Sequence, residues 1–280
     1  MIDQDTRANF DTVLVTAIHV SQALEKLPTD RVGEIASHLV TQNVVTGLSI
    51  SLLIHPLQRT GIPGLPATFT VTDLPSLCIL TRGVVETYLT LFYLAIQPIS
   101  IAEREFRLLW WDWHEVNERI WSLSRIGSKA KGLETFRKKR SELRPSITKH
   151  PNYSCLPDRL MQEFEQKRPP SDAVLMKKAE IAEAAGIHPD QFRVLYKSLS
   201  QYAHAQPVAV STLLSLSATS PEIELHFGLA ARYATSYLLF SVRDLIKIFP
   251  QGRNFTDEKF WKLVAIWSAV HKADLAKVQR

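Results

Sequence analysis

Two short polar segments contain the residue types that acid–base chemistry on a phosphate would need. In the first, Arg82 and Glu86 are the only charged residues between Asp73 and Glu103. They are four residues apart, so on a helix they share one face. Burying a guanidinium and a carboxylate is costly unless they pair. This pair therefore predicts either a structural ion pair or a guanidinium that holds a phosphate and is oriented by the carboxylate.

The second segment, Tyr196 to His204, reads YKSLSQYAH. Helical spacing places Lys197, Ser200 and His204 along one face. His204 precedes Pro207 and is expected near a helix end, where the helix dipole favours the imidazolium. An imidazole, a serine one turn away and a lysine are the groups that acid–base work on a phosphodiester requires. A surface or capping histidine is the competing interpretation, and only the geometry of neighbouring groups decides between them.

The formal net charge of +5 is concentrated in one part of the sequence. Residues 125–144 contain eight basic residues against two acidic ones, a local excess of +6. The run Arg137, Lys138, Lys139 and Arg140 lies at its centre and is the predicted surface for RNA or an acidic protein partner. A solvated, lysine-rich helix face is the alternative.

Several cofactor chemistries have no motif in this sequence. It contains no glycine-rich phosphate loop, dinucleotide fingerprint, paired-cysteine zinc pattern or His-Glu-x-x-His helix. The other histidines show no ligand-like spacing. Cys78 and Cys155 stand far apart and are expected to be reduced and buried. We therefore expect no cofactor, no metal and a reducing environment.

A cytoplasmic location is predicted. Asp3 and Asp5 stand where a secretory signal would need basic residues. The most apolar stretch, Leu77 to Ile96, has about the length of a membrane span. Its two charges, Arg82 and Glu86, would be costly in lipid, so a helix inside a bundle is expected instead.

The elements that must position these residues are predicted to be helices. Apolar residues recur at spacings of three and four along most of the chain. A breaker-rich loop is expected at 55–74, and residues 222–227 alternate like a strand. The fold class is all-α, a multi-helix bundle in one domain of residues 1–280, with a mobile, loop-rich insertion at about 145–170.

The segments RGVVE, followed by Tyr93, and YKSLSQYAH resemble an uncharacterised family of bacterial all-helical proteins. Its members carry an Arg and a Glu one turn apart on a central helix, then a Tyr, Ser, Tyr and His run on a later one. The resemblance covers roughly residues 74–207. More distantly, the chain is similar to the HEPN superfamily, whose active members are metal-independent ribonucleases with an arginine four to six residues before a histidine.

Carried onto this sequence, the resemblance implies that His204 is the acid–base residue and that Lys197 takes the arginine position. Lysine lacks the planar bidentate fork, so the sequence departs from the pattern there. Arg82 and Glu86 would complete the catalytic group with Ser200 and Tyr202. The implied function is RNA handling, as a metal-independent ribonuclease effector of phage defence. The alternative is a non-enzymatic interaction module in which an Arg-Glu-His lock is structural, and a homodimer is considered in either case.

Overall fold

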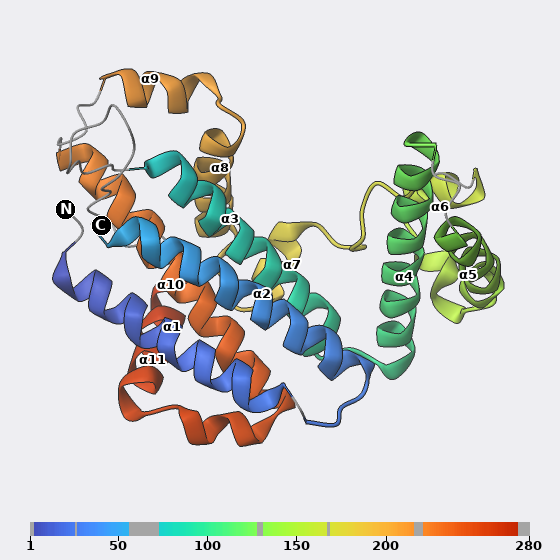
Figure 1. The fold of residues 1–280 in the computed structure, drawn as a ribbon, viewed down its shortest axis with the longest axis horizontal. Coiled ribbons are helices and arrows are strands. Elements are labelled where there is room, and N and C mark those ends of the chain that lie inside the picture. Colours follow the sequence, from blue (N-terminus) through green and yellow to red (C-terminus); the bar gives the residue numbers. More distant parts are fainter. Residues whose placement is uncertain are drawn as a thin grey trace. The chain divides into compact units, whose positions relative to one another are not determined.

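The predicted all-α bundle is confirmed in the computed structural model of the chain (Figure 1). It describes residues 3–25, 27–55, 73–127, 131–166, 169–215 and 221–273, and their regular structure is entirely helical. The strand-like pattern at 222–227 was misleading, because these residues form the first turns of α10 (Pro221–Ile248). Ile223 and Phe227 are buried there, and their spacing of four fits a helix face as well as it fits alternation.

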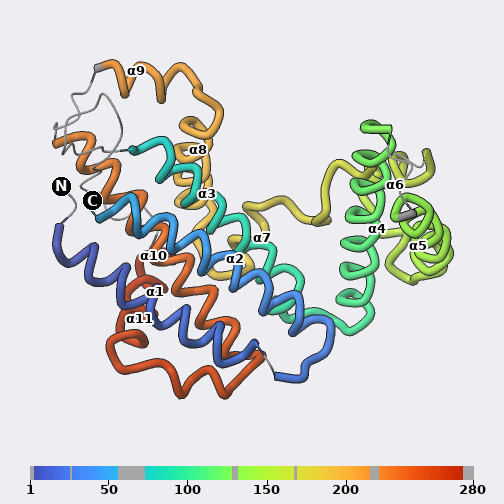
Figure 2. The backbone as a smooth tube through the Cα atoms, viewed as in Figure 1, coloured from blue at the N-terminus to red at the C-terminus, as the bar shows by residue number. Residues whose placement is uncertain are grey.

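The chain divides into two compact units, where the sequence predicted one domain. The first, the bundle unit, consists of residues 1–96 and 178–280, and the second, the inserted unit, of residues 97–177. Figure 2 follows the chain from α3 (Leu74–Leu91) into the inserted unit and back into α7 (Lys178–Ala184).

The bundle unit is built around α3 and α10, which pack against each other and against α2 (Arg31–Ile54). Three aspartates set where its first helices begin. The side chains of Asp3, Asp30 and Asp73 accept backbone N–H groups at 2.7, 2.8 and 3.0 Å. Such N-caps satisfy donors that a helix start leaves without partners. The other helices of the unit are α1 (Gln4–Leu24), α8 (Pro189–Ala203), α9 (Pro207–Ser215) and α11 (Glu258–Lys272).

Three local features lie at the ends of the helices that carry the polar segments. A π-helical turn at Phe92–Ile96 follows α3 at the boundary of the inserted unit. Gly186 has a φ of +82° just after α7, a conformation that glycine adopts without strain. Pro189 then begins α8, where its missing N–H costs nothing. The chain therefore turns sharply from α7 into α8.

The inserted unit has its own aromatic core. It contains α4 (Ile101–Arg125), α5 (Lys131–Thr148), a 3₁₀ turn at Pro151–Cys155 and α6 (Asp158–Glu165). Its core side chains are Phe106, Trp110, Trp113, Ile147, Leu156, Leu160 and Phe164. The segment at 145–170, expected as a loop-rich insertion, thus contributes Ile147, Leu160 and other apolar groups to this core.

The two cysteines differ in exposure. Both are free; Cys78 is buried in α3, whereas Cys155 is exposed in the 3₁₀ turn. The expectation that both are buried was therefore wrong for Cys155. Its short turn leaves it on the solvent side while its neighbour Leu156 packs into the core.

Among the described residues, two helical segments pass a length and hydropathy test for a membrane span. They are Arg31–Ile54, with mean hydropathy 1.2, and Leu74–Ile96, with mean hydropathy 1.3. Both pack within the bundle unit, and core helices of soluble proteins pass the same test. The expected loop at 55–74 falls mostly outside the described residues, which resume at Asp73.

Candidate functional site

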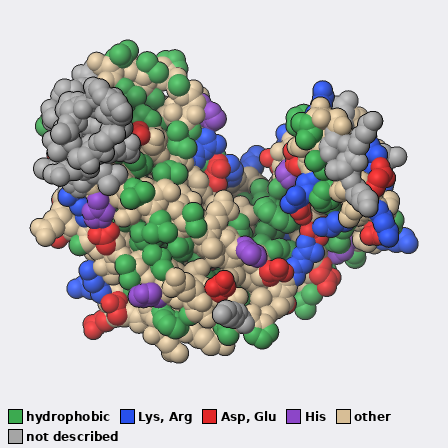
Figure 3. Space-filling model, viewed as in Figure 1, with side chains coloured by type: hydrophobic (Ala, Val, Ile, Leu, Met, Phe, Trp, Pro, Cys, Tyr) green, Lys and Arg blue, Asp and Glu red, His purple; other side chains and the backbone are tan. Residues whose placement is uncertain are grey.

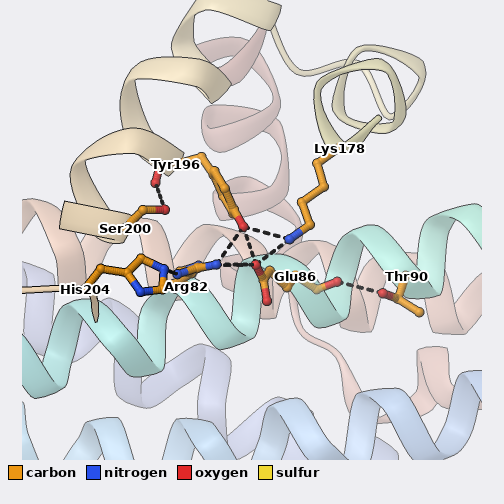
Figure 4. Close-up of polar contacts among 7 residues, drawn as sticks. All are labelled: Arg82, Glu86, Thr90, Lys178, Tyr196, Ser200 and His204. Carbon is orange, nitrogen blue, oxygen red and sulfur yellow. Dashed lines mark hydrogen bonds and ion pairs between the residues drawn. The ribbon is translucent and has the colours of Figure 1, made fainter. Parts of the chain in front are cut away.

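The two polar segments meet where α3 packs against α8. Arg82 Nη1 lies 2.9 Å from Nε2 of His204, which is 122 residues away in the sequence. Arg82 Nη2 donates to the phenol oxygen of Tyr196 at 3.1 Å, and Nε donates to Glu86 Oε1 at 3.2 Å. All three nitrogens of the guanidinium therefore have protein partners, which Figure 4 shows.

A single carboxylate oxygen gathers donors from three helices. Glu86 Oε1 accepts from Arg82 on its own helix, from Tyr196 on α8 and from Lys178 on α7, whose Nζ lies 2.6 Å away. The same ammonium donates to the Tyr196 hydroxyl at 2.7 Å. We call this group the Glu86 cluster, and its members are Arg82, Glu86, Lys178, Tyr196 and His204.

Sequence reasoning missed Lys178 and gave Tyr196 no role. Tyr196 lies eight residues, or about two helical turns, before His204. This spacing alone indicates that the two side chains lie on about the same helix face. Lys178 offers no such signal, because it follows Lys177 in an ordinary lysine-rich run. The Tyr196 ring is held by stacking on Phe192, with centroids 5.4 Å apart, and Lys178 Nζ lies 4.9 Å from its centre.

The cluster is open to solvent. The side chains of Arg82, Glu86 and Lys178 are 21%, 35% and 43% exposed, and His204 is exposed. Partial burial opposes ionisation of Glu86, but hydrogen bonds from Lys178 and Tyr196 outweigh it and hold the Glu86 pKa below its usual range. Burial likewise opposes the charge on Lys178, yet bonds to Glu86 and Tyr196 raise its pKa. The charged groups are thus two cations and one anion, which leaves one positive charge in excess.

The contact with Arg82 defines the protonation state of His204. Guanidinium nitrogens only donate hydrogen bonds, so Nε2 of His204 must be the acceptor. The ring is then neutral, with its hydrogen on Nδ1. His204 caps the end of α8, donating its backbone N–H to the carbonyl oxygen of Ser200 at 3.2 Å. Protonation of Nε2 would break its bond to Arg82.

Three predicted site residues stay outside the cluster. Lys197 follows Tyr196, so it projects about 100° away around the helix and is exposed. Ser200 Oγ donates to the backbone oxygen of Tyr196 at 2.6 Å, a bond within α8. Tyr202 is buried, and that burial raises its pKa. The structure brings together Arg82, Glu86 and His204 and leaves these three apart from them.

The predicted RNA-binding residues all lie on α5 of the inserted unit. The ion pairs are Arg137 with Glu134 at 2.6 Å, Lys138 with Glu142 at 4.0 Å and Lys139 with Glu115 at 3.8 Å. Arg140 forms no ion pair with another described residue. The local positive charge is thus partly neutralised, yet the unit holds 16 basic and 11 acidic residues, so the whole net charge of +5 belongs to it. Figure 3 shows charges of both signs interspersed among its side chains.

Within the described residues, no group of three or more His, Cys, Asp or Glu side chains is arranged to hold a metal ion. Comparisons with protein-family models, with curated proteins and with solved structures found no match for this chain. The chemistry of the Glu86 cluster must therefore be argued from its own geometry.

Proposed function

We propose that the Glu86 cluster binds a phosphate of RNA and that His204 acts there as the acid–base residue of a metal-independent ribonuclease. The observation that carries the proposal is the 2.9 Å contact between Arg82 Nη1 and His204 Nε2. It puts a phosphate-binding guanidinium directly beside a neutral, exposed imidazole. Lys178, which is 43% exposed, bonds Glu86 and so positions the carboxylate that orients this guanidinium.

Substrate binding and base activation are coupled in this arrangement. A phosphodiester oxygen competes with His204 for Arg82, since guanidinium–phosphate bonds are charge-assisted. Once Arg82 turns to the phosphate, His204 Nε2 is free to take the proton of the ribose 2′-hydroxyl. The 2′ oxygen then bonds to phosphorus, the bond to the 5′ oxygen breaks, and the leaving oxygen takes a proton from water. The products are a 2′,3′-cyclic phosphate and a 5′-hydroxyl.

The inserted unit would supply the remaining RNA contacts. Its net charge of +5 favours a polyanion, and RNA phosphates compete with exposed carboxylates for Arg137, Lys138 and Lys139. Exposed ion pairs are weak, so exchanging them costs little. A cytoplasmic effector that acts on RNA during phage infection remains part of the proposal.

The test is cleavage of end-labelled single-stranded RNA by the purified protein in excess EDTA. General acid–base catalysis contributes about 10²–10⁴-fold, so His204→Ala should slow cleavage by at least about 100-fold. Lys197→Ala is the matched control, because Lys197 lies on the same helix outside the cluster and should leave the rate unchanged. The proposal is contradicted by a wild-type protein that does not cut RNA, or by equal rates for wild type and His204→Ala.

A second candidate is the non-enzymatic interaction module. It is favoured by one observation: every guanidinium nitrogen of Arg82 already has a protein partner, and the Glu86 cluster ties together α3, α7 and α8. The cluster then only stabilises the packing of these helices, and the inserted unit binds an acidic protein partner. In that case Arg82→Ala lowers stability, and wild-type protein leaves RNA intact in the same assay.

A further inference from the structure

The Glu86 cluster is joined to the inserted unit through the covalent chain. The inserted unit ends at Lys177, and the next residue, Lys178, donates to Glu86 at 2.6 Å and to Tyr196 at 2.7 Å. A displacement of the chain at this boundary therefore acts first on the Lys178 ammonium. No other member of the cluster stands next to a boundary.

The opposite boundary is also close to the cluster along the chain. Helix α3 carries Arg82 and Glu86 and continues through the π-helical turn at Phe92–Ile96, after which the inserted unit begins at Gln97. Thr90 Oγ1 donates to the backbone oxygen of Glu86 at 3.0 Å. The chain thus enters and leaves the inserted unit by two of the three elements that hold the Glu86 carboxylate.

The two units differ in what they attract. The inserted unit carries the whole formal charge of +5, whereas the bundle unit balances 17 basic residues with 17 acidic ones. Trp121, 50% exposed on α4, lies under the guanidinium of Arg125 at 5.5 Å, a pair on which a base can stack. Charge and stacking together favour single-stranded RNA as the ligand of the inserted unit.

We infer that Lys178 is a positioning residue through which RNA bound to the inserted unit activates the Glu86 cluster. This inference rests on the proposed function and adds its regulation. When Lys178 withdraws, Glu86 Oε1 loses a donor and attracts Arg82 more strongly. Arg82 Nη1 then leaves Nε2 of His204, and the imidazole becomes available as a base. In the unliganded protein Lys178 keeps the cluster in the arrangement in which Arg82 Nη1 bonds Nε2 of His204.

The test separates the regulatory ligand from the substrate. A dinucleotide serves as the substrate, and a 2′-O-methyl oligonucleotide, which lacks the attacking hydroxyl, serves as the ligand of the inserted unit. We expect the oligonucleotide to raise kcat on the dinucleotide by about 5–150-fold, the usual range of coupling between sites. Lys178→Met should raise kcat without the oligonucleotide and abolish further stimulation. Lys178→Arg should restore the stimulation, and Lys197→Met should behave as wild type.

A second readout does not depend on cleavage. Hydrogen exchange of peptides that cover residues 82–86 and 196–204 should increase when the oligonucleotide binds wild-type protein, and it should not respond in Lys178→Met. If exchange responds but RNA is never cut, the coupling stands and the ribonuclease proposal fails.

Three results would overturn the inference. The first is oligonucleotide binding with no change in exchange in either peptide. The second is a loss of kcat in Lys178→Met, which would make Lys178 a substrate-binding group instead. The third is binding of polyglutamate without binding of the oligonucleotide, which would assign the inserted unit to an acidic protein.

Discussion

Two polar clusters of the bundle unit contain the same five kinds of side chain in opposite surroundings. The Glu86 cluster combines a carboxylate, a tyrosine, an arginine, a lysine and a histidine at the surface. The second, which we call the Asp244 cluster, combines the same kinds around a carboxylate that is fully buried, although its lysine is 58% exposed. Its members are Asp244, Tyr88, Arg243, Lys247 and His271.

Asp244 is fully buried and fully paired. Its carboxylate accepts from Tyr88 at 3.0 Å, from Arg243 at 2.8 and 2.9 Å and from Lys247 at 2.7 Å. His271 is 2% exposed and bonds Ser236 Oγ at 2.9 Å. Burial first, and the nearby charge of Arg243 second, lower the pKa of His271 to about 4.

The difference lies in exposure and in the number of helices that supply donors to the carboxylate. Arg243, Asp244 and Lys247 all belong to α10, and Tyr88 adds α3. The Glu86 cluster instead draws on α3, α7 and α8, and its carboxylate is 35% exposed. No ligand can reach the buried Asp244 carboxylate to compete for its partners, so its role is to stabilise the fold. At the open cluster, the Arg82 guanidinium can exchange a protein partner for an incoming anion.

The largest expected effect is on Asp244. Asp244→Asn removes the buried negative charge and leaves Arg243 without its counter-ion, so the free energy of unfolding should fall by about 3–5 kcal/mol. Glu86→Gln should cost no more than about 1 kcal/mol, because that pair is solvated. Urea unfolding of both variants measures the contrast. Equal losses would mean that the two clusters do not differ in the way their exposure indicates.

The next effect is a dependence of stability on pH. The pKa of His271 is near the usual histidine value of 6.5 in the unfolded chain and about 4 in the fold. The unfolded chain therefore binds a proton on His271 at a higher pH than the folded protein does. The contribution of His271 to the free energy of unfolding is fully present above about pH 6.5. It falls by about 3 kcal/mol in all as the pH drops toward 4.

This pH dependence is checked by unfolding curves across that range. His271→Gln should flatten the profile. A slope that survives in His271→Gln would assign the acid sensitivity to other groups.

A smaller effect than that of His271 is expected at Arg82. Arg82→Ala leaves Glu86 with Lys178 and Tyr196 as partners, so the loss should be about 1–2 kcal/mol, between the values for exposed and buried pairs. Arg82→Lys should regain part of it, and Lys197→Ala should stay within about 0.5 kcal/mol of wild type. Thermal unfolding measures all three. A loss as large as that of Asp244→Asn would favour a structural role for the Glu86 cluster over a catalytic one.

The sequence predicted the helices well because their signals are local. Asp30 and Ser100 are residue types typical of helix starts, and both cap a helix with their side chains. The apolar stripe that contains Trp110 and Trp113 is the core of the inserted unit. Each of these features depends on periodicity or on residues within one turn.

The same local signals could not reveal the clusters completely. Asp244 sits among charged residues on α10, so nothing in its neighbourhood indicates complete burial. Lys178 acquires its role from packing against residues 92 and 18 positions away. The division into two units was missed because the helix breaks beside its boundaries, at 97–100 and 169–177, resemble ordinary connections between helices of one bundle.

The cysteine pair gives the protein a built-in site for a chemical label. Burial raises the pKa of the Cys78 thiol to about 12, which keeps it from forming the reactive thiolate, whereas Cys155 is exposed in the inserted unit. A maleimide dye should therefore attach at Cys155 without any substitution in the chain. Its fluorescence would report when a ligand reaches the inserted unit and leave the Glu86 cluster chemically untouched.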